Sequence, residues 1–146
     1  MAGDNKFESI YPLTPMQQGM LFHTLLHPGA GAYLVQLHWL LEGPLDAGAL
    51  RRAWQAAVDH HPVLRTAFAW DRKERPLQAV LARTEVPWAE RDWSGLGTAQ
   101  QDQRLGQWLE EDRQRDFDLK RAPLMRLMLV RLGGARHRLE IGRAHV

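Results

Sequence analysis

The chain has 146 residues, of which 45% are hydrophobic and 25% are charged, as in ordinary globular domains. A chain of this length buries roughly 70% of its unfolded surface when it folds as one domain, so we expect one domain rather than two. The 19 basic residues nearly balance the 17 acidic ones, which excludes disorder and acidic or basic tails as descriptions of the whole chain.

The small excess of positive charge comes from the end of the chain, where four arginines accompany one acid, Glu140. Because the charge is not spread over a basic face of the fold, we expect no nucleic-acid partner. The lack of cysteine excludes disulfides, thiolate metal sites and a cysteine nucleophile. No signal-peptide pattern opens the chain, and no apolar stretch approaches the length of about 18 residues that spans a membrane. We therefore expect a cytoplasmic protein without a membrane partner.

Hydrophobic periodicity predicts a helix over residues 15–26, capped by Thr14, and then a strand over 33–42 with one apolar face. A second helix is expected to begin after Asp46 and to end at 60–62. The first half of the chain thus alternates between helical and extended patterns.

Two short extended segments, 64–70 and 77–82, flank the charged run 71–75, which predicts a hairpin turn. Trp88 and Trp93 follow in a stretch whose proline and glycine content predicts a loop.

A polar helix over 99–115 is expected to lie on the surface of a sheet. Its apolar stripe consists of Leu105, Trp108 and Leu109. The most apolar segment, 124–130, predicts a central strand, and the glycine pair 133–134 turns it into a partner strand that begins at 136. Helices that alternate with strands in this way indicate an α/β fold of mixed α+β layers.

Seven histidines invite a catalytic or metal-binding interpretation. His60 and His61 are adjacent, so on a helix their side chains point about 100° apart and cannot chelate one metal comfortably. We favour a role at the helix end, beside its exposed carbonyl groups, over catalysis. His23 and His27 have the i, i+4 spacing of a zinc-binding helix, but no glutamate follows His23, so we expect no metal.

The residues by themselves predict no assembled active site. Ser9 and Ser94 are the two serines of the chain, and neither lies in the Gly-x-Ser-x-Gly turn of a serine hydrolase. The glycine-containing segments lack the lysine or the further glycine of phosphate-binding loops.

Three segments, 11–23, 60–68 and 117–126, together form a specific pattern, and their order resembles that of condensation domains from nonribosomal peptide synthetases. The likeness spans about residues 10–139. The second segment is similar to the family motif Arg-His-Glu-x-Leu-Arg-Thr-x-Phe. The positions that match the family motifs are Pro12, Leu13, Thr14, Pro15, Met16, Gln17, Gln18, Gly19, His23, His61, Leu64, Arg65, Thr66 and Phe68.

This resemblance implies a fold similar to chloramphenicol acetyltransferase, in which two lobes form a V with a tunnel between them, and this chain would be a partial N-terminal lobe. It implies an acyl or peptidyl transferase that forms amide bonds. The substrates would be thioesters on the phosphopantetheine arms of aminoacyl or peptidyl carrier proteins, delivered among neighbouring synthetase domains. No cofactor is expected to bind the chain directly.

The family's catalytic motif, His-His-x-x-x-Asp-Gly, is missing, because no histidine has an aspartate four positions later. The resemblance therefore implies a catalytically incomplete chain with no catalytic residue of its own. We expect residues 1–9 to be a linker, 10–140 a truncated N-terminal lobe and 141–146 a non-native tail. The ending Ile-Gly-Arg-Ala-His-Val resembles a translated sequencing adapter, and a stop codon after Val146 in an independent assembly would contradict this interpretation.

Two roles remain open: part of a condensing enzyme that is inactive alone, or a non-catalytic module that docks a carrier protein or another synthetase chain. The first segment is more similar to subtypes that accept a D-configured donor, or that combine epimerisation with condensation, than to the L-to-L subtype. The substrate amino acids stay undetermined.

Three further expectations concern packing. Met16, Met20 and Leu21 are expected to fill the core rather than to line the tunnel. Arg65 lacks the motif aspartate that the family role implies, so we expect it to be solvated or paired weakly with a local acid. The strand 124–130 would present an exposed edge, which predicts poor solubility or oligomers.

Overall fold

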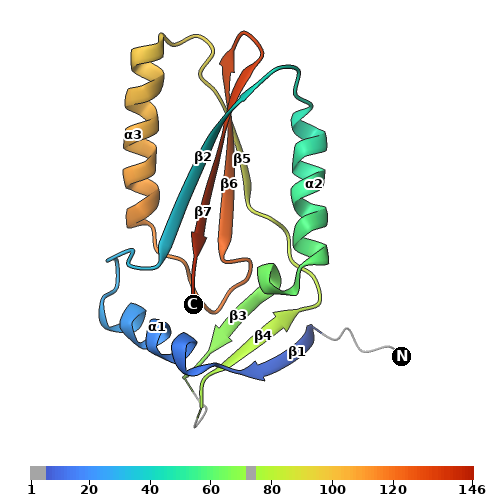
Figure 1. Ribbon diagram of the computed structural model, residues 1–146, viewed down its shortest axis with the longest axis vertical. Helices are drawn as coiled ribbons and strands as arrows, with labels where there is room; N and C mark the ends of the chain where they lie inside the picture. The colour runs from blue at the N-terminus through green and yellow to red at the C-terminus, as the bar shows by residue number, and fades with distance from the viewer. Residues whose placement is uncertain (1–5, 72–74) are drawn as a thin grey trace.

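The computed structural model describes residues 6–71 and 75–146, and it contains two separate sheets (Figure 1). The smaller sheet is antiparallel, and its strands in spatial order are β1 (Phe7–Pro12), β4 (Leu77–Leu81) and β3 (Thr66–Ala69). The larger sheet has the order β2 (Leu34–Glu42), β7 (Arg136–Ala144), β6 (Met125–Gly133) and β5 (Trp88–Asp92). Its strands pair antiparallel except for β5 and β6, which are parallel.

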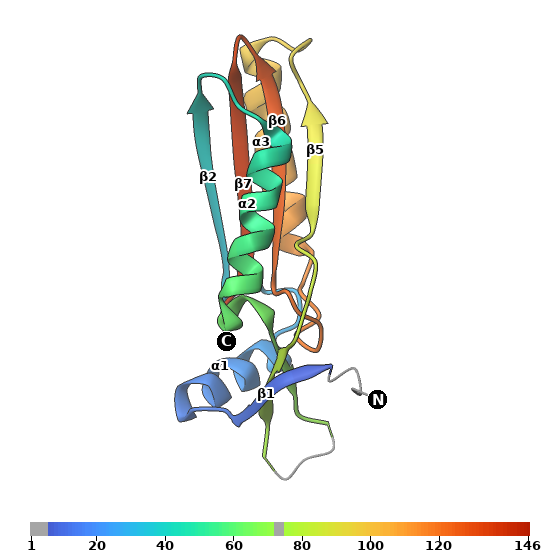
Figure 2. The same cartoon turned by 90° about the vertical axis from the view of Figure 1, so that its right-hand side faces the viewer.

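Helices α2 (Ala47–His60) and α3 (Thr98–Gln114) cover opposite faces of the larger sheet (Figure 2). On the α2 face, Val58 packs with buried residues of β6 and β7 such as Leu127 and Leu139. On the α3 face, Leu105 packs with Met128. The predicted mixed α/β layers are therefore present, and the strand 124–130 is central, as expected.

Helix α1 (Pro15–Leu26) lies against the smaller sheet and begins where the sequence predicts (Figure 1). The Thr14 hydroxyl accepts a hydrogen bond from the Gln17 backbone N–H at 3.2 Å, and the Gln17 side-chain oxygen accepts one from the Thr14 N–H. Leu21 is buried as predicted and Met20 is partly buried, but Met16 is 76% exposed. The core prediction for Met16 is wrong, because Leu21 packs with Phe68 and Leu119 in a buried cluster that does not include Met16.

Two local predictions are also wrong. Leu64 and Arg65 belong to a 3₁₀ helix (Pro62–Arg65), not to the extended segment, which begins only at Thr66. Trp88 opens strand β5, and the buried Trp93 follows that strand directly. Apolar and polar residues do not alternate along the five residues of β5, so hydrophobic periodicity gives no strand signal there. The strand is defined instead by its parallel pairing with β6.

Strand β6 has neighbours on both sides, so the prediction of an exposed edge at 124–130 is wrong; the open edges of the larger sheet are β2 and β5. The predicted hairpin joins β3 to β4, although residues 72–74 of its turn lie outside the described residues. Residues 7–9 of the expected linker lie in β1, and residues 141–144 of the expected tail lie in β7. Within the described ranges, no helix is long and apolar enough to cross a membrane.

Candidate functional site

The three motif segments meet around one cavity of about 310 Å³, which we name the motif cavity. The first segment contributes the beginning of α1, the second contributes the 3₁₀ helix and β3, and the third contributes the start of β6. The end of β7 closes the remaining side. The lining residues are Thr14, Met16, Gln17, Met20, Val63, Leu64, Thr66, Phe68, Gln78, Leu124, Met125, Arg143, Ala144, His145 and Val146.

Local capping and cross-sheet hydrogen bonds hold the first segment at the cavity. The capping box orients Gln17, whose side-chain amide exchanges hydrogen bonds of 3.2 Å with Gln78 on β4. The Gln18 side chain turns back and donates to the Leu13 carbonyl at 3.1 Å, while Leu13 itself is buried. A Cβ at Gly19 would have no neighbour within 4 Å, so close packing does not explain the lack of a side chain there.

The second segment divides into cavity-lining and structural residues. Leu64, Thr66 and Phe68 line the motif cavity. His61 caps the C-terminus of α2 through its backbone, and its side chain is exposed. His61 thus lies at the helix end, but its backbone N–H, and not its side chain, donates to the Ala57 carbonyl.

Arg65 is 4% exposed, so the prediction that it is solvated is wrong. Its guanidinium donates to the Val58 carbonyl at 3.1 Å, to the Glu8 carboxylate at 2.8 Å and to the carbonyls of Leu81 and Ala82. The predicted acidic partner exists, but it comes from β1 rather than from a local segment. Because the group is buried and donates to four acceptors, we expect its removal to cost far more than the loss of a surface ion pair.

The third segment connects both sheets. The Phe68 N–H donates to the Leu119 carbonyl at 2.8 Å, which ties β3 to the segment that leads into β6. Arg126 on β6 binds the buried carboxylate of Asp112, and its guanidinium carbon lies 4.0 Å from the centre of the Phe117 ring. Sequence reasoning missed Asp112, because nothing distinguishes it from the other acids of a polar helix.

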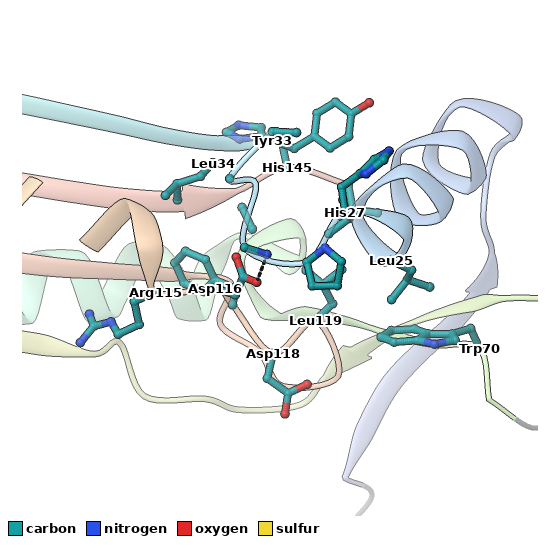
Figure 3. Close-up of a pocket in the computed structure, with 18 residues that line it drawn as sticks. Leu25, His27, Tyr33, Leu34, Trp70, Arg115, Asp116, Asp118, Leu119 and His145 are labelled. Carbon is teal, nitrogen blue, oxygen red and sulfur yellow. Dashed lines mark hydrogen bonds between the residues drawn. The ribbon is translucent and has the colours of Figure 1, made fainter. Parts of the chain in front are cut away.

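A second cavity, of about 230 Å³, lies between the end of α1, the loop that follows it and residues 115–119 (Figure 3). The Asp116 carboxylate accepts a hydrogen bond of 2.7 Å from the Gly29 N–H and closes this loop. His145 borders both cavities, and its backbone N–H donates to the Tyr33 carbonyl at 2.9 Å. The His145 Nδ1 is buried and has no partner among the described residues.

Glu140 on β7 is a buried group that sequence reasoning missed. It is fully buried, and neither carboxylate oxygen has a partner among the described residues. Burial raises the pKa of the Glu140 carboxyl to about 7; the nearby Arg138 opposes this rise and Asp112 adds to it. Cross-strand neighbours Met128 and His38 flank it.

The motif cavity is lined by apolar side chains together with the amides of Gln17 and Gln78. The described residues contain no group of three or more histidines or carboxylates that could hold a metal. The rings of His23 and His27 lie edge to face with centroids 4.9 Å apart, without a third ligand in the described part of the chain. The Ser94 hydroxyl bonds Asp92 at 2.6 Å rather than a histidine. Apolar walls with a few amides can hold an elongated ligand in a defined orientation.

The structure thus brings only some of the predicted motif positions to the motif cavity. Those that line it are Thr14, Met16, Gln17, Leu64, Thr66 and Phe68. The remaining positions lie outside its lining: Pro12, Leu13, Pro15, Gln18, Gly19, His23, His61 and Arg65. Among these, His61 caps α2 through its backbone, and Leu13 and Arg65 are buried.

Comparison with known proteins identifies relatives of almost the whole chain. A family model described as Condensation domain matches residues 7–145. One of the linear gramicidin synthase chains of Brevibacillus parabrevis is 45% identical over 131 residues, which cover 89% of this chain and 2% of that relative. Tyrocidine synthase 2 of the same organism is 36% identical over 125 residues, covering 86% of this chain and 4% of the relative. The chain therefore spans a small fraction of these relatives' length.

Solved structures agree with this assignment. The first condensation domain of the calcium-dependent antibiotic synthetase matches with a TM-score of 0.83 and 27% identity, over 95% of this chain and 33% of that one. A four-domain nonribosomal peptide synthetase bound to AMP and glycine matches in fold, with a TM-score of 0.81 and 18% identity, over 95% of this chain and 10% of that one. The chloramphenicol acetyltransferase-like fold that the motifs predict is confirmed. The chain belongs to the condensation domain family of nonribosomal peptide synthetases, of which it spans the N-terminal part.

Proposed function

We propose that this chain is the N-terminal part of an amide-bond-forming condensation domain, and that the motif cavity forms one wall of the channel for a carrier-bound thioester. The observation that supports this is the convergence of three motif segments, distant in sequence, on one cavity beside the end of β7. Residues that cap a helix locally would not need to meet there, so the convergence favours a shared binding role.

The proposed ligand is the phosphopantetheine arm of an aminoacyl or peptidyl carrier protein, so the chain itself holds no cofactor. Met20 and Leu64 supply apolar walls, and the amides of Gln17 and Gln78 supply hydrogen-bonding groups. An arm built from methylene and amide units matches such a lining. Because the chain lacks His-His-x-x-x-Asp-Gly, we propose that it forms no peptide bond alone.

A chimera tests this proposal. Residues 1–139 are joined to the remainder of a condensation domain from the linear gramicidin synthase relative, which restores the catalytic motif, and dipeptide formation from loaded carrier proteins is measured. We expect product from the chimera and none from the 146-residue chain. In the chimera, Met16→Trp should narrow the cavity mouth and lower the rate roughly tenfold or more, which corresponds to about 1.4 kcal/mol.

Phe7→Trp is the control, because Phe7 is also an exposed apolar residue but does not line the motif cavity. Equal rates for the two tryptophan variants, with both folded by circular dichroism, would contradict the assigned cavity. Product formation by the 146-residue chain alone would contradict the proposed incompleteness.

The second candidate function is a docking module, and the surface of α1 supports it. Met16, Phe22 and Leu26 are all more than half exposed on this helix. Apolar side chains gathered on one exposed helix are typical of a protein-binding surface. A titration of the chain with a fluorescently labelled carrier protein should then saturate, and Phe22→Ser should weaken the binding. A flat titration would discard this role.

A further inference from the structure

The C-terminal end of α3 is held by one largely buried side chain of β6, that of Arg126. Its guanidinium donates a hydrogen bond to the Asp112 carboxylate, and it also donates to the backbone carbonyls of Asp112 and Arg115 at 2.6 and 2.7 Å. The side chains of Arg126 and Asp112 are 11% and 1% exposed. The last carbonyl groups of a helix have no partner within the helix, so Arg126 caps α3 as well as pairing with its buried acid.

Asp112 is engaged by other elements at the same time. The Gln36 side chain on β2 donates to the Asp112 carboxylate at 3.0 Å and to the Leu109 carbonyl of α3 at 2.9 Å. Arg115 approaches the carboxylate at 3.3 Å, but its side chain is 65% exposed. A carboxylate is stable in a buried position when such donors surround it. The end of α3 is therefore fixed against both β2 and β6 through one carboxylate.

Arg126 also contacts the segment that follows α3, residues 115–119, which we name the wall segment. The guanidinium carbon lies 4.0 Å from the centre of the Phe117 ring, within the range of a cation–π contact. Phe117 in turn packs against the buried cluster that contains Phe68 and Leu119. The two ends of the third motif segment, Phe117 and Arg126, are thus in direct contact in the folded chain.

The wall segment borders both cavities. All five of its residues line the second cavity (Figure 3). The Leu119 carbonyl accepts the hydrogen bond from the N–H of Phe68, which lines the motif cavity. Arg126 itself lines neither cavity. A loop that forms the wall of a binding site keeps its shape only when groups outside the loop support it, and a displacement of about 1 Å is enough to impair the site.

We propose that Arg126 is a positioning residue, which holds the wall segment against the end of α3 and thereby determines the shape of the channel for the carrier-bound thioester. This role rests on the proposed function, because it takes the cavities to be part of that channel. Arg126 acts through Phe117 and Leu119 rather than by touching the arm. A lysine cannot replace it, since one ammonium group neither serves three acceptors in this fork geometry nor lies flat on an aromatic ring.

Cysteine labelling tests the anchoring, and the chain offers a clean background because it has no cysteine. Leu119→Cys introduces a thiol at a buried position of the wall segment, and Val58→Cys introduces one on α2, at the opposite face of the larger sheet. Arg126→Lys should open the wall segment locally and raise the rate at which N-ethylmaleimide labels Leu119→Cys roughly tenfold or more. The rate for Val58→Cys, which reports opening of the whole fold, should change less than about twofold.

The chimera with the remainder of a condensation domain tests the consequence for binding. Arg126→Lys should raise the KM for a loaded carrier protein roughly tenfold, with a smaller effect on kcat. A loss of folded protein would instead lower the apparent kcat and leave KM unchanged, so this comparison separates positioning from general destabilisation. Arg131→Lys is the matched control, because it makes the same substitution on β6 in an exposed pair with Asp92 and should change neither constant.

Two labelling results would overturn the proposal: equal acceleration of Leu119→Cys and Val58→Cys by Arg126→Lys, or an unchanged rate for Leu119→Cys. In the chimera, a lower kcat with an unchanged KM would overturn it as well. A parent chimera that forms no dipeptide would contradict the proposed function, and the labelling rates would still decide whether Arg126 holds the wall segment.

Discussion

Glu140 is buried in the larger sheet without a hydrogen-bond partner among the described residues, and it should make the folded state less stable as the pH rises. Burial raises its pKa to about 7, above the ordinary value of 4.5 that applies to the unfolded chain. The folded state therefore binds the proton more tightly. The loss of folding stability that comes from ionising the Glu140 carboxyl is absent below the pKa of the unfolded chain. This loss grows between pH 4.5 and 7 and is complete above pH 7.

The size of this penalty follows from the two pKa values. A raised pKa of this extent corresponds to roughly 3 kcal/mol of lost stability at pH 8 relative to pH 4. Glu140→Leu removes the buried carboxyl, so the variant should be more stable than the parent chain by at least this amount at pH 8. The advantage should shrink by roughly 3 kcal/mol toward pH 4, where the parent glutamate is protonated in the folded state and largely so in the unfolded state.

Urea unfolding followed by tryptophan fluorescence measures this difference, because the chain has six tryptophans. All other ionisable side chains are common to both proteins, so their contributions cancel in the comparison. Glu140→Gln is the matched control, because it keeps the side-chain shape and an unpaired polar group but cannot ionise. Its free energy of unfolding should therefore not show the Glu140-dependent decrease between pH 4 and pH 8. A difference between parent and Glu140→Leu that stays constant from pH 4 to pH 8 would refute the reasoning.

Two further predictions concern close packing. Arg65→Ala should lower the free energy of unfolding by about 3–5 kcal/mol, because it leaves several buried acceptors without a donor. Glu8→Gln, at a half-exposed carboxylate, should lower it by less than about 1 kcal/mol. Equal losses for the two variants in urea unfolding would contradict the role assigned to the buried Arg65 guanidinium. Gly142→Ala should destabilise the chain, since a Cβ there would lie 2.8 Å from Asp112 Oδ2. Gly106→Ala in α3, with no atom nearby, should instead stabilise it by up to about 1 kcal/mol in the same assay, and a loss at Gly106 would be inconsistent with an open site.

Local signals predict the helices well. Thr14 with Pro15 locates the beginning of α1, and Asp46 does the same for α2, because a capping side chain satisfies backbone N–H groups of its own helix. These interactions join residues three positions apart, so they are visible in the sequence before any tertiary contact is known.

The candidate site is only partly predictable from the sequence. The order of three motif segments indicates the family, yet it does not distinguish residues that line the motif cavity from residues that cap or pack. Met16 looks like a core residue from its spacing and is exposed at the cavity, while Arg65 looks solvated and is buried. Each of these outcomes depends on what a distant segment places beside the residue.

The family, the helix boundaries and the central position of β6 could be predicted without any tertiary contact, because capping, hydrophobic periodicity and the order of motifs can be identified along the chain. Three features emerged only from the folded chain: β5 is a strand, Glu8 pairs with Arg65, and β2 lies at an edge of the larger sheet. Those features arise from contacts between segments far apart in the chain. Burial and edge exposure therefore depend on the whole fold, and a local pattern predicts them only in part: Leu21 is buried as its spacing predicts, whereas Met16 is exposed.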